Sequence, residues 1–183
     1  MIKFLLKQNK NSRAFTLVET MVAISIFTLA VTALMAALAS GISNTTFAKQ
    51  KMTATYLAQE GIEYVRNMRD SDVLGGSTGW SSFVTNLTST YPFCADSSKS
   101  CGFSFLNSSF VDCSTSDQCK LKINNAGSYD IGNSGGVDSG FTRKINITNV
   151  TANEKKVTST VTWGSSPEHS IGFSENLFNW TEI

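Results

Sequence analysis

The sequence predicts an α+β fold in which one long N-terminal helix packs on an antiparallel β-sheet. Three observations support this prediction: residues 15–42 carry a single charge, residues 44–70 repeat apolar side chains every three or four positions, and several later segments alternate apolar with polar residues. The first two patterns are typical of helices, and the third is typical of strands with one buried face. We therefore divide the chain into four segments, 1–14, 15–42, 43–70 and 71–183.

The composition excludes several classes of protein. The chain has 183 residues, of which 41% are apolar and 16% are charged, and its formal net charge is +1. It is too apolar for a disordered chain and has too little positive charge for a nucleic-acid binder with a basic face. His169 is the single histidine of the sequence, which argues against His-based metal sites and against most catalytic triads.

Residues 15–42 are expected to form a membrane-inserting helix. Their one charged residue is Glu19, and no proline interrupts them. As a helix they extend about 42 Å, and crossing a bilayer takes roughly 20 residues. The preceding segment, residues 1–14, carries four basic residues and no acid, so we expect a cytoplasmic N-terminus and an extracytoplasmic remainder.

Two simple alternatives compete for this segment. One is a secretory signal cleaved after Ala39, although the apolar region is longer than such signals usually have and contains Glu19. The other is a plain signal anchor, which leaves Glu19 without a partner. A carboxylate deep in the bilayer costs about 2.5–3.5 kcal/mol, so this residue needs an explanation.

Residues 13–19, Arg-Ala-Phe-Thr-Leu-Val-Glu, resemble the processing signal of the type IV pilin and type II secretion pseudopilin family. In that family a short basic leader ends in a small residue, and Phe, Thr, Leu, a branched aliphatic residue and Glu lead into an apolar helix. The resemblance implies that a membrane-embedded prepilin peptidase cleaves between Ala14 and Phe15 and methylates the new amine of Phe15. Ala14 stands where the family usually has Gly, and Ala36 stands about where many members have a helix-bending proline.

The resemblance implies a prepilin-like structural subunit, a minor pilin or pseudopilin with a pilin-like α+β fold, rather than an enzyme. Such a subunit lies in membrane lipid before assembly and then joins other pilin or pseudopilin subunits in a type IV pilus, a type II secretion pseudopilus or a competence filament. An assembly ATPase and an inner-membrane platform protein are the further partners implied, and no cofactor is implied. The alternative is a single-span membrane-anchored extracellular binding module with no filament role.

Glu19 has a physical role that does not depend on the family name. Cleavage after Ala14 creates a positive amine at Phe15, one helical turn before Glu19. If helices pack side by side with an axial stagger, Glu19 of one subunit meets the amine of its neighbour, and this pair sets the register. The simpler alternative is that Glu19 lies near the headgroups at the cytoplasmic face.

Residues 43–70 are expected to continue the same helix as its amphipathic half. The predicted apolar face consists of Ala54, Leu57, Ala58, Gly61, Ile62, Val65 and Met68. We predict one helix from Phe15 to about Met68, ended by the Asp-, Gly- and Ser-rich residues 70–80.

The remaining residues, 71–183, are expected to form a β-rich extracytoplasmic head. A short helix is predicted at Trp80 to Leu87, and β segments from about Tyr91 onward. The alternating runs are 119–123, 129–131, 141–148, 157–163 and 170–174. The first two runs are expected to pair across a turn at 124–127. The last three predict an antiparallel meander with one face on the long helix, and the apolar tail at 177–180 is expected to dock on this domain.

Four cysteines, Cys94, Cys101, Cys113 and Cys119, lie in the head. An even number close together in an extracytoplasmic domain predicts disulfides. Three connectivities are open, and we favour Cys94–Cys101 with Cys113–Cys119 because each closes a short loop. A metal site is disfavoured because the cysteines lack CxxC spacing and neighbouring histidines.

The loop at 130–138 offers several oxygen ligands but lacks the spacing of an EF-hand. We interpret it as a surface loop between strands and leave calcium binding as an alternative. No phosphate-binding loop, nucleophile elbow or pair of catalytic carboxylates stands out in the sequence.

Overall fold

The structure is a computed structural model, and it describes residues 15–75, 78–96, 98–132, 135–166 and 168–180. The chain divides into two compact units, Met1–Phe47 and Ala48–Ile183. One helix, α1 (Leu17–Leu74), contributes residues to both units. The predicted leader, residues 1–14, lies outside the described residues.

The second unit contains the C-terminal part of α1 and the remaining elements. In chain order these are α2 (Gly79–Thr85), the π-helix η1 (Asn86–Thr90), α3 (Pro92–Ala95), β1 (Cys101–Ser104), β2 (Ser109–Asp112), the 3-10 helix η2 (Ser116–Cys119), β3 (Lys120–Ile123), β4 (Tyr129–Asp130), β5 (Val137–Thr151), β6 (Glu154–Trp163) and β7 (His169–Phe178).

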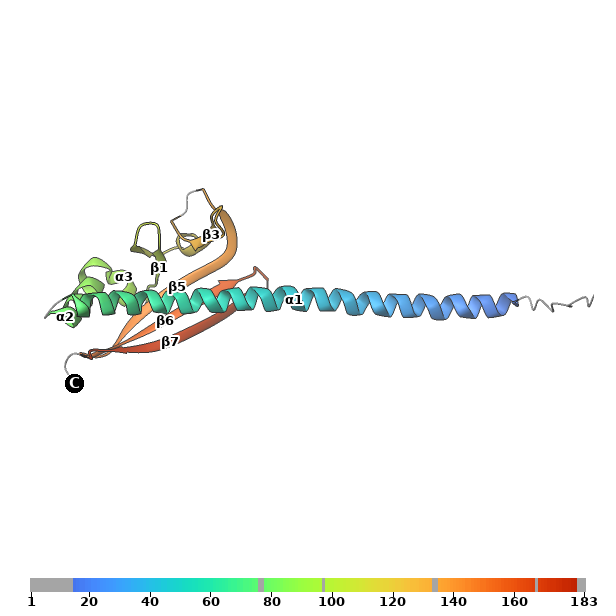
Figure 1. The fold of residues 1–183 in the computed structure, drawn as a ribbon, viewed down its shortest axis with the longest axis horizontal. Helices are drawn as coiled ribbons and strands as arrows, with labels where there is room; N and C mark the ends of the chain where they lie inside the picture. Colours follow the sequence, from blue (N-terminus) through green and yellow to red (C-terminus); the bar gives the residue numbers. More distant parts are fainter. Residues whose placement is uncertain (1–14, 76–77, 97, 133–134, 167, 181–183) are drawn as a thin grey trace, which may run out of the picture. The chain divides into compact units, whose positions relative to one another are not determined.

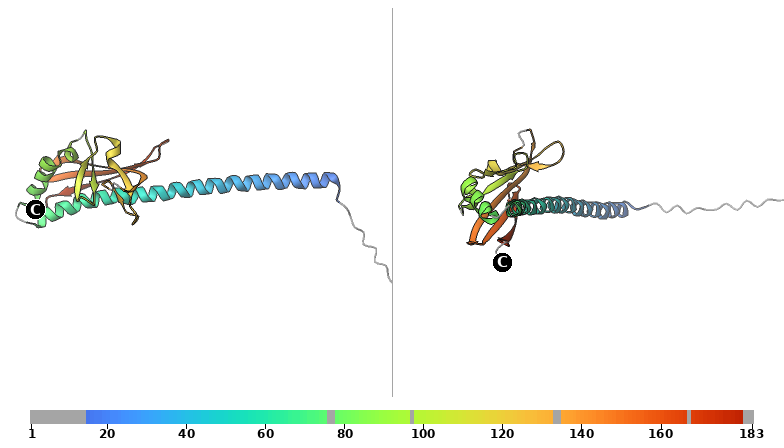
Figure 2. Two further views of the ribbon diagram at one scale, coloured as in Figure 1. Left: turned by 90° about the horizontal axis from the view of Figure 1, so that it is seen from above. Right: turned by 60° about the vertical axis from the view of Figure 1, so that its left-hand side comes forward.

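The strands form one antiparallel sheet organised around β5. Along one side β5 pairs with β6, which in turn pairs with β7. Along its other side β5 pairs with β3, which carries β4, and with β1, which carries β2. Figure 1 shows β5, β6 and β7 side by side with α1 lying along them, and Figure 2 shows the same packing from two other directions. The predicted α+β architecture, with a long helix on an antiparallel sheet, is confirmed.

The predicted apolar face of α1 is the face that packs on the sheet. Its buried residues are Ala54, Leu57, Ala58, Gly61, Ile62, Val65 and Val73. The buried residues of β5 and β6 alternate as the strand period requires, with Ile145 and Ile147 on β5 and Val157 and Val161 on β6. Two apolar clusters result, and α1 contributes to both of them.

Gly61 allows α1 to approach β6 closely. A Cβ atom at this position would lie 2.5 Å from the hydroxyl oxygen of buried Ser159. Real Cβ contacts essentially never come under 3.0 Å, so any larger residue would displace the helix or the serine. The glycine costs some helix propensity, and the close packing of helix on sheet requires it.

The helix ends later than the sequence analysis predicts, at Leu74 instead of about Met68. Residues 71–74 contain no helix breaker, and Val73 is buried. Gly79, at the start of α2, passes so close to the helix end that a Cβ there would lie 2.3 Å from the Cα of Val73. Burial of Val73 against the returning chain therefore extends the helix.

Two further predictions for the head need correction. The segment after Tyr91 begins with a helical turn, α3, where β structure was expected, because Pro92 sits at the first helical position, which its fixed φ favours. The apolar tail docks only in part: Leu177 is buried in β7, whereas Phe178 and Trp180 remain 50% and 45% exposed. The expected helix at Trp80 to Leu87 is confirmed as α2 followed by η1.

Candidate processing and assembly site

The motif residues form the start of α1. Phe15 and Thr16 precede the helix, and Glu19 lies in its first turn. The Thr16 hydroxyl accepts a hydrogen bond from the Glu19 backbone N–H at 3.2 Å, and the Thr16 carbonyl accepts one from the Thr20 N–H at 3.1 Å. Thr16 therefore caps the helix, and the carboxylate of Glu19 lies at the positive end of the helix dipole. Ala14 lies outside the described residues.

Sequence reasoning overlooked this capping role, although a signal for it was present. Thr16 and Glu19 have the Ser/Thr-x-x-Glu spacing of a capping box, in which the first side chain satisfies the backbone N–H of the fourth residue. The same two residues that mark the family motif thus also begin the helix at a defined position.

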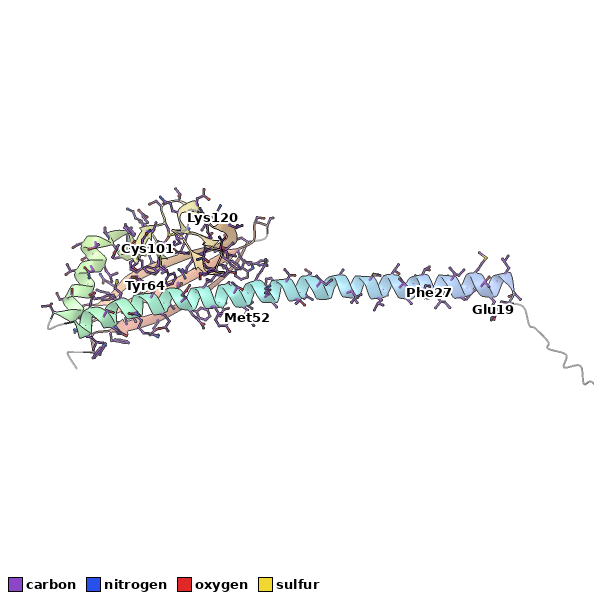
Figure 3. All side chains as sticks on the ribbon, turned by 45° about the horizontal axis from the view of Figure 1, so that its top comes forward. Glu19, Phe27, Met52, Tyr64, Cys101 and Lys120 are labelled. Carbon is purple, nitrogen blue, oxygen red and sulfur yellow. A yellow bond between two sulfur atoms is a disulfide. The ribbon has the colours of Figure 1, made fainter. Side chains whose placement is uncertain are left out.

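The described part of the first unit buries nothing. Every residue from Phe15 to Met52 is exposed, including large apolar side chains such as Phe27, Leu29 and Ile42. Figure 3 labels Glu19 and Phe27 on this exposed part of α1. A run of exposed apolar side chains along a whole helical segment is typical of a region that contacts lipid or another protein.

The polar residues of this stretch satisfy their own hydroxyl groups. Thr20, Ser25, Thr28 and Thr32 each donate to a backbone carbonyl three or four residues earlier, at 2.8 to 3.0 Å. These four hydroxyls need no water, which lowers the cost of moving this part of the helix into an apolar medium. Within the described residues, α1 is the one helix that is long and apolar enough to cross a membrane.

The second unit ties α1 to the sheet through a buried cation. Arg143 of β5 is fully buried, and its guanidinium donates to the Glu60 carboxylate at 2.5 Å and to the carbonyls of Leu57 and Phe103, both at 3.3 Å. Burial lowers the pKa of Arg143, and the neighbouring Glu60 carboxylate opposes this effect. Because one guanidinium contacts the helix and β1 at once, it fixes both against β5.

A second ion-pair group joins α1 to the edge strand of the sheet. Arg66 contacts the carboxylate of Glu175 on β7 and that of Glu63 one turn earlier, the latter at 2.5 Å. The hydrogen bond with Glu175 is the main cause that raises the pKa of Arg66. These side chains are about a third exposed or more, so the pairs contribute modestly to stability.

The cysteines lie in two bonded pairs, Cys94–Cys101 and Cys113–Cys119. This is the connectivity that the short loops favour. The first bond joins α3 to β1 within the larger apolar cluster, and the second joins the residue after β2 to the end of η2. The described segment contains no free cysteine.

The acidic loop proposed as a possible calcium site begins with a structural residue. The buried Asp130 carboxylate accepts hydrogen bonds from the Ser104 hydroxyl and from the backbone N–H groups of Phe105, Leu106 and Ile131. These contacts occupy both oxygens. Residues 133 and 134 of this loop lie outside the described part, and the described residues contain no group of three or more His, Cys, Asp or Glu suited to a metal ion.

Comparison with known proteins agrees with the N-terminal motif. Residues 9–39 match the family model described as the prokaryotic N-terminal methylation motif. No curated protein and no solved structure matches the chain. The family match supports a protein of the type IV pilin and pseudopilin type, and the apolar N-terminal helix and the paired cysteines fit that class. It points to a structural subunit rather than an enzyme, to processing by a peptidase, and to membrane anchoring.

Proposed function

We propose that this chain is a minor pilin or pseudopilin that enters a filament through its N-terminal helix. The filament is a type IV pilus, a type II secretion pseudopilus or a competence filament. One observation carries the proposal: the Phe15–Glu19 motif leads directly into a helical segment, up to Met52, whose apolar residues are all exposed. Such a helix requires lipid before assembly and neighbouring helices after it.

The proposed sequence of events begins in the membrane. The basic leader remains in the cytoplasm, and a prepilin peptidase cleaves between Ala14 and Phe15 and methylates the amine of Phe15. Glu19 of the mature subunit then pairs with the amine of a neighbouring subunit, which sets the axial register of the helices. An assembly ATPase and an inner-membrane platform protein drive this transfer from lipid into the filament, and the head faces outward.

N-terminal mass spectrometry of the membrane-extracted protein tests the proposal. We expect a mature chain that begins with a methylated Phe15. A chain that still begins at Met1 would favour the membrane-anchored binding module, and one that begins at Ser40 would favour a cleaved secretory signal. A catalytically inactive prepilin peptidase strain is the matched control, and in it the leader should remain attached.

A further inference from the structure

A shallow groove lies in the second unit, between α1, the turn after β1 and the β3–β4 hairpin. It consists of two adjoining cavities of about 360 and 490 Å³ that share Leu57, Glu60 and Tyr129. Volumes of this size are usual for small-molecule sites. The other lining residues are Thr53, Tyr56, Phe105, Leu106, Asn124, Ser128 and Asp130. The lining includes three aromatic side chains and two acids, and no lysine or arginine.

The walls of this groove are held in place by internal hydrogen bonds. Asp130 fixes the turn that carries Phe105 and Leu106, because it accepts hydrogen bonds from both of their backbone N–H groups, at 2.9 and 3.2 Å. The Asn124 side-chain oxygen accepts hydrogen bonds from the N–H groups of Ala126 and Ser128, at 3.0 and 2.9 Å, and so shapes the hairpin turn. The site is therefore formed before any ligand arrives, which lowers the entropy cost of binding.

The aromatic rings stand partly open to the groove. Tyr56 is 64% exposed and Phe105 is 42% exposed. Tyr129 is half-buried, and its ring packs edge-on against Phe141 at 6.1 Å between centroids. Phe105 is similarly supported by Phe103, at 5.0 Å between centroids, and the buried Arg143 guanidinium lies over its ring, 5.7 Å from the centroid, so the ring is open on one side only. Rigid rings with a free face offer large contact area at little entropic cost.

The polar groups of the groove are suited to a neutral ligand with many hydroxyl groups. Arg143 already compensates the charge of Glu60, which leaves one carboxylate oxygen to accept hydrogen bonds. The Asn124 amide nitrogen and the hydroxyls of Tyr56 and Ser128 add donors. The lining lacks the basic residue that an anion requires, and its one exposed carboxylate is already paired, which disfavours a cation.

From this combination of flat aromatic faces and compensated hydrogen-bonding groups, we infer that the groove binds a neutral carbohydrate chain. Apolar ring faces of the sugar stack on Tyr56 and Phe105, and its hydroxyls bond to Glu60 and Asn124. This function belongs to the head and does not depend on assembly of the N-terminal helix into a filament.

Saturation-transfer NMR and calorimetry on the full chain in detergent micelles test this inference. The probes are cellohexaose, maltohexaose and the hexamer of N-acetylglucosamine, with a Lys- and Phe-containing peptide as the cationic comparison. We expect saturation transfer to at least one oligosaccharide, and binding about fivefold weaker in Tyr56→Ala, as the loss of one stacking contact predicts. Met52→Ala is the matched control, because Met52 lies one turn away on the same helix, is 62% exposed and does not line the groove (Figure 3).

Three outcomes would overturn the inference: no transfer to any oligosaccharide, equal weakening by Tyr56→Ala and Met52→Ala, or binding of the cationic peptide alone. Tyr56→Phe serves as a second variant, since it keeps the ring and removes the hydroxyl, and we expect it to retain most of the affinity. The measurement uses solubilised monomers, so failure of filament assembly would leave its result unchanged.

Discussion

At the scale of single residues, a few side chains carry the requirements of both units. Glu19 is the one charge in an apolar segment of 28 residues, and Arg143 is a fully buried cation in the head. A charge in an apolar environment is stable only when it meets an opposite charge. Arg143 meets Glu60 within the same chain, whereas the described part of the chain offers Glu19 no cation. This contrast is the physical reason to seek the partner of Glu19 in a neighbouring subunit.

We expect Glu19→Ala to be inserted and cleaved normally but to be excluded from filaments. Removing the carboxylate makes the segment more apolar, so insertion becomes easier, while the amine of the adjacent subunit loses its partner. Breaking such a buried pair costs about 3–5 kcal/mol, which reduces incorporation by more than about tenfold. Co-expression of tagged wild-type and variant chains, followed by analysis of sheared filaments, measures this loss.

The controls for this experiment come from the same helix. Glu19→Asp keeps the charge with a shorter reach and should give an intermediate level. Thr28→Ala removes a hydroxyl that is satisfied within the helix and should enter filaments like wild type. Equal recovery of Glu19→Ala and Thr28→Ala would contradict the register role.

A second residue-scale prediction concerns Gly61. Alanine at this position gains about 1 kcal/mol in helix propensity but places its Cβ 2.5 Å from the Ser159 hydroxyl oxygen. We expect overpacking to exceed the gain, so that Gly61→Ala lowers the free energy of unfolding by about 1–3 kcal/mol. The double variant Gly61→Ala/Ser159→Ala removes that hydroxyl, and the Cβ at position 61 then lies 3.3 Å from the Cβ at position 159. Most of the stability should therefore return. Chemical denaturation in detergent measures all three variants, and a Gly61→Ala chain at least as stable as wild type would refute the argument.

At the scale of elements, α1 serves two different environments in sequence. Its first part exposes every residue, and its later part buries positions spaced three and four residues apart.

The two disulfides stabilise the region around β1, where the elements are short: α3, β1, β2 and η2 have four residues each. Elements of this length bury little surface on their own, so covalent links contribute a larger share of their stability.

We expect the two disulfides to contribute unequally. In the chain-entropy model each of these short loops contributes about 2–3 kcal/mol. Cys94 and Cys101 also belong to the large apolar cluster, whereas Cys113 and Cys119 do not. Cys94→Ala/Cys101→Ala should therefore lower the melting temperature more than Cys113→Ala/Cys119→Ala does. Calorimetry of the oxidised variants measures the difference, and equal or reversed shifts would contradict this ranking.

At the scale of the whole molecule, the division into two units separates two tasks. The described residues of the first unit have no core, and the second unit contains both apolar clusters and both disulfides. A unit that holds all of its own buried residues has what independent folding requires.

We therefore predict that a fragment of residues 48–183 folds without the rest of the chain. Removing residues 1–47 deletes exposed apolar surface, and none of its described residues, 15–47, is buried. The fragment should be soluble and monomeric, with dispersed amide signals in its NMR spectrum and a cooperative thermal transition. A fragment that aggregates or lacks tertiary near-ultraviolet circular dichroism would show that the head needs the first unit. A 62–183 fragment is a useful comparison, since it loses Ala54, Leu57 and Ala58 from the core and should fail to fold.

The sequence by itself determined the features that depend on local pattern. The uncharged run at 15–42, the motif at Phe15–Glu19 and the spacing of apolar residues on α1 are all periodic or contiguous signals, so the helix, its buried face and its family resemblance could be predicted from them. The alternation in β5, β6 and β7 gave the meander for the same reason. Short loops also favoured the observed cysteine pairs.

Only the tertiary structure decided the features that depend on distant contacts. The extension of α1 to Leu74 follows from burial of Val73 beside Gly79, and the short strands β1 and β2 carry too few residues to show a period. The sequence separates Arg143 from Glu60 by 83 positions, so no local pattern could predict their ion pair. Tyr56 and Phe105 line one groove only because β5 brings the β1–β2 and β3–β4 hairpins beside α1. Local propensity acts over a few residues, whereas buried ion pairs and binding grooves depend on which elements the fold places together.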